Sequence, residues 1–253
     1  MSPVFVKGFG LWSLGFCDVM AWLTQNRDST VLKPEARLLK GALKRRSSNV
    51  TRMAVEAYSQ AANDAGCSPN TAHSVWATAH GEHETALRLF ETMHEGEGKV
   101  SPTNFHNSVH NSPSGYASIS AKNTAPSTTL TGGSELVAAA LIEASCMARS
   151  FNNDTILVFA DEALKPPFDL PGSEQPLAVA LCLGSESNGS HAKISGIRRD
   201  SAPLQPVEGF GHLHISAILP LVEQILKKRS GRVSLEFGEN EEVWGVDVDI
   251  ENS

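Results

Sequence analysis

Residues 99–162 read KVSPTNFHNSVHNSPSGYASISAKNTAPSTTLTGGSELVAAALIEASCMARSFNNDTILVFADE and contain a turn, a strand, a helix and a second strand in succession. The Ala-Pro-Ser sequence at residues 125–127 predicts the turn, and residues 128–133 predict the first strand, which ends in two glycines. Residues 135–150 predict a long apolar helix, and residues 155–159 (TILVF) predict a buried strand. This alternation is typical of a layered α/β protein.

The rest of the chain continues the alternation. We expect further strands at residues 3–12, 74–78, 176–184, 191–197, 233–237 and 243–250. We expect further helices within residues 38–65, 82–94, 107–120 and 213–228. Gly8 and Gly10 are expected to break the first strand, Ser47 or Ser48 to cap the first of these helices, and Pro113 to interrupt the third. The 253 residues can form one domain, residues 1–253.

Composition excludes several classes of partner. The formal net charge of −7 and the pI near 5.7 make the chain a poor non-specific binder of nucleic acid or anionic membranes. The first residues carry no signal-peptide pattern, and the apolar helix at residues 136–148 is too short to cross a membrane. We therefore expect a cytoplasmic protein with neither nucleic-acid nor membrane partners.

Metal-ligating residues are scattered along the sequence. The cysteines are far apart, form no CxxC pair and are expected to be single buried thiols: Cys17, Cys67, Cys146 and Cys182. Two histidine pairs have suitable spacing but bring no evident third ligand: His80 with His83, and His106 with His110. We expect no metal site and no cofactor.

Ser134 lies where the strand at residues 128–133 meets the helix at residues 135–150. A helix N-terminus offers N–H donors and a positive dipole to a developing oxyanion, so this is a suitable place for a nucleophile. Serine is also a good N-cap, and a serine nucleophile needs an adjacent base. Both interpretations stay open, and we expect capping.

The segment at residues 99–162 resembles, without a gap, the middle of the N-terminal half of a β-ketoacyl synthase. Its Lys-x-Ser-Pro opening at residues 99–102, the asparagine-rich segment that follows, the turn at residues 125–127 and the Phe-Ala-Asp-Glu sequence at residues 159–162 match that family in order and spacing. The resemblance implies the thiolase-like layered fold, with one nearly complete half and a shortened second half.

Catalytic residues of that family are missing or incomplete here. Ser134 stands at the position of the nucleophilic cysteine, and Gly211-His212 resembles the family's second histidine block. The family's lysine five residues before that histidine is Val207, and its His-Gly-Thr-Gly-Thr motif has no counterpart. We therefore expect no catalysis by Ser134, and a structural or tunnel-wall role for His212.

The resemblance implies a non-catalytic chain length factor that pairs with an active ketosynthase as a heterodimer. It is nearest to the short members found in aryl polyene gene clusters, within type II polyketide or fatty-acid-like biosynthesis. Two alternatives stay open: a Ser134-dependent acyltransferase or thioesterase, and a purely structural ketosynthase partner. The sequence gives neither substrate nor chain length.

Two further groups of residues have expected roles. In the family, the segment after the Lys-x-Ser-Pro opening reaches across the dimer interface and closes the partner's acyl tunnel; here it is Thr103, Asn104, Phe105 and His106. Phe105 is equally compatible with an ordinary core position. A basic cluster is compatible with docking of an acidic acyl carrier protein or with a solvated helix face: Lys40, Lys44, Arg45, Arg46 and Arg52.

Overall fold

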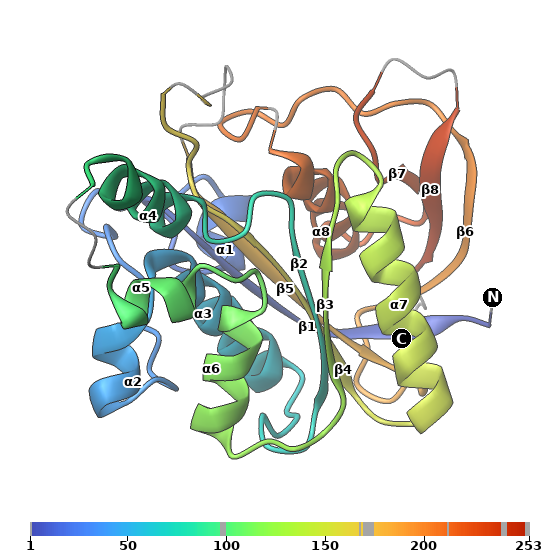
Figure 1. The fold of residues 1–253 in the computed structure, drawn as a ribbon. Helices are drawn as coiled ribbons and strands as arrows, with labels where there is room; N and C mark the ends of the chain where they lie inside the picture. Colours follow the sequence, from blue (N-terminus) through green and yellow to red (C-terminus); the bar gives the residue numbers. More distant parts are fainter. Residues whose placement is uncertain are drawn as a thin grey trace.

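In the part of the chain that the structure describes, eight strands pair into one mixed sheet in the order β3-β2-β4-β5-β1-β6-β8-β7 (Figure 1). This computed structural model describes residues 2–96, 100–166, 168, 175–211, 213–238 and 242–250. The strands are β1 (Val4–Ser13), β2 (His73–Thr78), β3 (Ser127–Thr131), β4 (Thr155–Asp161), β5 (Leu177–Gly184), β6 (Ala192–Ser201), β7 (Gly231–Ser234) and β8 (Val243–Asp249). Strands β2, β3 and β4 are parallel, whereas β5 runs antiparallel to both β4 and β1.

Helices cover both faces of the sheet. They are α1 (Val19–Leu23), α2 (Gly41–Arg46), α3 (Asn49–Asp64), α4 (His83–His94), α5 (Pro102–Asn107), α6 (Ser112–Ala121), α7 (Leu136–Phe151), the 3₁₀-helix η1 (His214–Ile218) and α8 (Leu219–Leu226). On one face α3 and α6 pack against Ile156, Val158 and Ala160 of β4. On the other face α7, η1 and α8 pack against Leu157 and Phe159. The result is the layered α/β arrangement that the alternating sequence predicts.

Each expected strand has a counterpart, and most differ only at the ends; the strand expected at residues 233–237 is instead β7, which begins at Gly231 and stops at Ser234. Strands β2, β4 and β5 are buried along their whole length, as their continuous apolar sequences predict. Ser48 is the N-cap of α3 and accepts a hydrogen bond from the Thr51 amide at 3.0 Å, as expected. The candidate helix at residues 107–120 is instead divided between α5 and α6. Pro113 lies in the first turn of α6, where a missing N–H costs nothing.

The first strand does not end at Gly8 or Gly10 as expected, because β1 runs on through both residues; an irregularity remains between Val6 and Gly8, where its register with β5 shifts. A Cβ atom at Gly10 would lie 2.0 Å from the Ala57 carbonyl oxygen, and one at Gly8 would lie 2.6 Å from that of Ala61. Both carbonyls belong to α3. The glycines therefore allow α3 to approach β1 more closely than any side chain would permit.

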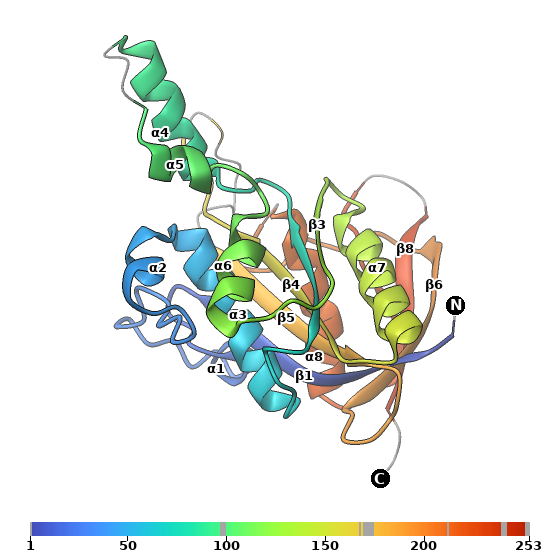
Figure 2. The ribbon, with the colours of Figure 1, turned by 60° about the horizontal axis from the view of Figure 1, so that its bottom comes forward.

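Helices α4 and α5 project from the body of the molecule (Figure 2). The start of α4 is held by two buried carboxyl groups. Glu82 accepts hydrogen bonds from the hydroxyl groups of Ser48 at 2.6 Å, Thr51 at 3.0 Å and Thr85 at 3.2 Å. Glu162, directly after β4, accepts one from the Glu84 amide in the first turn of α4 at 3.1 Å. Carboxyl groups at a helix N-terminus complement its dipole.

These two carboxyl groups and Glu84 titrate differently. Burial raises the pKa of Glu82, and it raises that of Glu162 to about 7 from an ordinary 4.5. The more exposed Glu84 receives hydrogen bonds from Lys165 and Arg88, which lower its pKa.

The helices of the described part of the chain were also compared with the length and apolar character that a membrane span needs. None of them meets both requirements.

We expect Glu162→Gln to change the pH dependence of stability. Because the folded-state pKa of Glu162 is raised from 4.5 to about 7, its contribution to stability is full below pH 4.5 and is lost as the pH rises through 7. At 1.36 kcal/mol per pKa unit, the free energy of unfolding of the variant relative to the wild type should rise by about 3 kcal/mol between pH 4.5 and 8.5. Urea unfolding across this range measures it.

Asp28→Asn is the control. Hydrogen bonds from Thr30 lower the pKa of this exposed carboxyl group, so it is ionised in both the folded and unfolded states above about pH 5.5, and the difference from wild type should be flat there. If the difference in the free energy of unfolding between Glu162→Gln and wild type were equally flat, the carboxyl group of Glu162 would not be titrating in a desolvated site.

Candidate functional site

The carboxyl ends of β2, β3 and β4 meet at one edge of the sheet because the three strands are parallel and in register. Asp161, the last residue of β4, is fully buried there. Its carboxylate accepts hydrogen bonds from the Thr78 hydroxyl at 2.6 Å, the Ala79 amide at 3.0 Å and the His80 amide at 2.9 Å. Burial raises the pKa of Asp161, and these three donors oppose the rise. The contacts fix the end of β2 to the end of β4.

Ser134 follows β3 at this same edge and is half-buried in a turn. The expected capping role is wrong: the N-cap of α7 is Glu135, whose side chain makes no capping hydrogen bond. The Leu136 amide donates to the Gly133 carbonyl at 3.1 Å, which places Ser134 within a tight turn before the helix begins. Among the described residues, no side chain hydrogen-bonds to the Ser134 hydroxyl, so none of them is placed as its general base.

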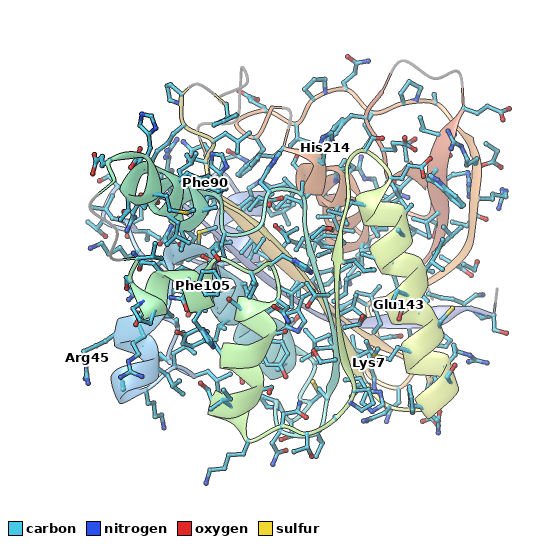
Figure 3. The ribbon with its side chains drawn as sticks, viewed as in Figure 1. Lys7, Arg45, Phe90, Phe105, Glu143 and His214 are labelled. Carbon is cyan, nitrogen blue, oxygen red and sulfur yellow. The ribbon has the colours of Figure 1, made fainter. Side chains whose placement is uncertain are left out.

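The histidines are distributed around the edge. His212, expected at the family's second histidine position, lies outside the described residues. His214 begins η1, and its ring centroid lies 6.4 Å from that of His80 (Figure 3). The ring of His83 at the start of α4 packs edge-on against Phe168, with centroids 5.6 Å apart, and burial lowers its pKa.

Among the described residues, the fold brings one set of three potential metal ligands together, and this set contains no histidine. It consists of Cys67, Asp154 and Cys182, whose ligand atoms lie within 4.8 Å of one another. The expectation of single buried thiols is wrong for Cys67 and Cys182, whose sulfur atoms are 3.7 Å apart, because α3 packs close to the sheet. It is also wrong for the remaining two, Cys17 and Cys146, which are exposed.

The projecting helices, which we call the α4–α5 arm, expose large apolar side chains. Leu89 is the buried residue of α4, while Phe90 and Met93 are 65% and 63% exposed. Phe105 on α5 is 68% exposed, so its alternative assignment to the core is wrong. Phe90 and Phe105 lie on neighbouring helices of the arm (Figure 3).

Two grooves run along the arm and share Phe105. The first, of about 530 Å³, lies between α4 and α5 and is lined by Ala86, Leu89, Phe90, Met93, Val100, Pro102, Phe105 and Ser108. The second, of about 730 Å³, lies between α5, α6 and α2. Of the candidate tunnel residues, Thr103 and His106 also line the second groove, and Asn104 is half-buried between its exposed neighbours. All four of these residues therefore belong to α5, at or beside the grooves.

A third pocket is much smaller. It lies between α3, α6 and the sheet, with Val50, Trp76, Glu82 and Pro113 among its lining residues, and measures about 20 Å³. That volume holds about one water molecule. This pocket is too small for an acyl chain.

The basic cluster lies beside the arm. Lys44, Arg45 and Arg46 are on α2, where Arg45 points away from the body (Figure 3). Arg52 on α3 is occupied by hydrogen bonds to the Lys44 carbonyl at 2.8 Å and the Ser47 hydroxyl at 3.0 Å. The Arg46 carbonyl accepts from the Asn107 side chain of α5 at 2.6 Å, which joins α2 to the arm.

Solved structures share this fold. One chain of the complex of a ketosynthase (ApeO) with its chain length factor (ApeC) from Xenorhabdus doucetiae matches with a TM-score of 0.73, 18% identity, and coverage of 98% of this chain and 100% of the other. The ishigamide ketosynthase/chain length factor matches with a TM-score of 0.68, 13% identity, and coverage of 98% and 99%. The AntDE:AntF complex, a type II polyketide synthase acyl carrier protein with its ketosynthase, matches with a TM-score of 0.63 and 15% identity, and the match covers 79% of this chain and 70% of the other.

At these identities the matches establish the fold, and they confirm the predicted thiolase-like layered architecture. A search of curated proteins found no significant match. The family model "Beta-ketoacyl synthase, N-terminal domain" matches residues 20–244, which is most of the 253-residue chain. The chain therefore belongs to the β-ketoacyl synthase N-terminal domain family.

Proposed function

We propose that this protein is a cytoplasmic, non-catalytic chain length factor that forms a heterodimer with an active ketosynthase and shapes its acyl tunnel. The pathway class would be type II polyketide or fatty-acid-like biosynthesis, of the aryl polyene kind. The observation that carries the proposal is the α4–α5 arm, an apolar projection whose large side chains are left exposed by the described part of the chain.

The exposed apolar side chains of the α4–α5 arm are typical of a surface that a partner protein covers. Isolated exposed apolar residues are normal, but Phe90, Met93 and Phe105 line connected grooves on two adjacent helices. Covering apolar surface stabilises an assembly by roughly 25 cal/mol per Å². Two similar structures are complexes of a ketosynthase with a chain length factor, which supports a ketosynthase as the partner here.

Ser134 supports the non-catalytic part of the proposal. A serine hydroxyl needs a base to become a nucleophile, and none of the described side chains hydrogen-bonds to it. The pocket of about 20 Å³ between α3 and the sheet also offers an acyl chain no room. An acyl chain would instead lie where the outer face of the arm meets the partner.

The position of α5 supports a role in setting product length. Pro102 and the N-cap Ser101 fix the start of α5, since the Ser101 hydroxyl accepts a hydrogen bond from the Asn104 amide at 3.3 Å. Asn104 then stands beside Phe105, which separates the two grooves. In this proposal Asn104 leaves space in the tunnel and Phe105 forms its wall or end.

The basic residues near the arm provide a place for a carrier protein. Lys40, Lys44, Arg45 and Arg46 are on or next to α2, and α2 is joined to α5 through Asn107. An acidic acyl carrier protein docked there would stand next to the interface. Arg52 contributes less to this surface, because its guanidinium is occupied within the protein.

We expect the chain to purify one to one with the ketosynthase of its own gene cluster, through an interface above roughly 2,000 Å². Phe90→Asp places a charge at the centre of the arm and should weaken the complex by about tenfold or more in a binding titration. Leu32→Asp is the matched control, since Leu32 is 66% exposed, against 65% for Phe90, and lies outside the grooves. Equal binding by both variants, or no complex with wild type, would contradict the proposal.

We expect substitutions on α5 to change product length. Asn104→Phe adds volume to a packed tunnel and should shorten the products, whereas Phe105→Ala should lengthen them or broaden their distribution. Mass spectrometry of products from the assembled heterodimer measures this. If both variants assemble normally and give the wild-type profile, the residues do not line the tunnel, and a purely structural partner role is favoured.

We expect Ser134→Ala to leave product formation by the complex within a few-fold of wild type, because an unassisted hydroxyl stays protonated and unreactive. The assay is turnover by the purified heterodimer, with assembly checked by size-exclusion chromatography. A loss of several orders of magnitude in an intact dimer would favour the Ser134-dependent acyltransferase or thioesterase.

A further inference from the structure

Two cysteines that are 115 residues apart in sequence are neighbours in space. Cys67 follows α3, and Cys182 lies near the C-terminal end of the central strand β5. Their sulfur atoms are 3.7 Å apart, and both thiols are reduced. A disulfide bond is about 2.05 Å long, so the two sulfur atoms have to move closer by about 1.6 Å to form one.

The backbone holds this pair together from both sides. The Cys67 amide donates to the Ala62 carbonyl at 3.0 Å and the Gly66 amide to that of Asn63 at 3.2 Å, a Schellman motif that ends α3. Gly66 has a φ of +65°, which glycine adopts without strain. On the sheet, Cys182 pairs with Gly8, the residue over which the end of α3 packs. The close approach of α3 to β1 therefore places Cys67 over Cys182.

The two thiols differ in environment. Cys67 is half-buried, whereas Cys182 is fully buried. A hydrogen bond from the Cys182 thiol and the nearby Lys7 ammonium both lower the pKa of Cys67, while the same hydrogen bond and burial raise the pKa of Cys182. Cys67 is thus the reachable thiol with the greater thiolate character, and Cys182 is a protected thiol in contact with it.

Charge near the pair favours thiol chemistry over metal binding. Asp154 is the third group within 4.8 Å, but its carboxylate already forms a salt bridge with Lys7 at 2.9 Å. A metal ion would have to compete with that ammonium for Asp154, and it would find three potential ligands among the described residues, whereas structural zinc sites use four.

We propose that Cys67 and Cys182 are a redox-active thiol pair that forms an intramolecular disulfide when the protein meets a hydroperoxide. The Cys67 thiolate attacks one peroxide oxygen, the O–O bond breaks, and the hydroxide that leaves takes up a proton. Cys67 is then a sulfenic acid. The Cys182 sulfur attacks the Cys67 sulfur, the S–O bond breaks, and water leaves with the Cys182 proton. In sum, two thiols lose two electrons and two protons, and one hydrogen peroxide becomes two waters.

The disulfide would tie the end of α3 to the central strand and close a long loop of chain. Such a cross-link restricts the unfolded ensemble and therefore stabilises the oxidised protein. It requires no change in the α4–α5 arm, so the proposal is independent of the proposed function.

Oxidation of the full-length protein by hydrogen peroxide tests the proposal. Trypsin places the four cysteines in four different peptides: residues 8–27, 53–88, 123–149 and 150–193. After alkylation and digestion without reductant, mass spectrometry should find residues 53–88 joined to residues 150–193, with the loss of two hydrogen atoms. The peptides with Cys17 and Cys146 should remain alkylated. The thermal midpoint of the oxidised protein should exceed that of the reduced protein by about 5–15 °C.

Cys67→Ser and Cys182→Ser should each abolish both the cross-link and the oxidation-dependent shift in thermal midpoint. Cys146→Ser is the control, because this exposed thiol on α7 should not be needed for either effect. The proposal is overturned if peroxide consumes Cys17 or Cys146 while residues 53–88 and 150–193 stay unlinked. It is also overturned if Cys67 is oxidised to its sulfinic or sulfonic acid without forming the bond to Cys182.

Discussion

The buried carboxylate of Asp161 is the interaction on which the arrangement of this protein depends most. An isolated charge in the core is costly, and here three donors from the end of β2 compensate it. These contacts hold the carboxyl ends of β2 and β4 together and set the course of the chain into α4. Glu162 follows directly and anchors the first turn of that helix. The edge of the sheet and the base of the α4–α5 arm are therefore one connected structure.

This edge of the sheet and the α4–α5 arm differ in the side chains and pockets that they present. The edge carries Ser134 in a tight turn, and none of the described residues serves as its base. The pocket between α3, α6 and the sheet holds about one water molecule. The arm carries Phe90 and Phe105 on its surface, around grooves of several hundred Å³. A subunit with this distribution is suited to completing a site on a partner, and this is the physical basis for proposing the role of a chain length factor.

Local sequence signals predicted most of the fold, while its long-range features needed the structure. Continuous apolar runs predict β4 and β5, and the sequence narrows the cap of α3 to Ser47 or Ser48, of which Ser48 is the cap, because these properties depend on neighbouring residues. The effect of Gly10 depends on α3, more than forty residues away, and the contact between Cys67 and Cys182 follows from the same packing. The apolar pattern of α4 correctly predicts a helix, but periodicity cannot distinguish a face that packs on the core from one that meets a partner. The structural or tunnel-wall role of His212 stays a prediction, because this residue lies outside the described residues.

The most direct test of the central claim is amide hydrogen exchange of the chain alone and in the presence of its ketosynthase, read at the α4–α5 arm. A partner that covers Phe90 and Phe105 should slow exchange in α4 and α5, because local opening of these helices would then expose a buried interface. Exchange in the C-terminal half of α7, on the other side of the sheet, should be unchanged. Formation of a complex with no slowing in α4 and α5 would contradict the account, since the partner would then bind elsewhere.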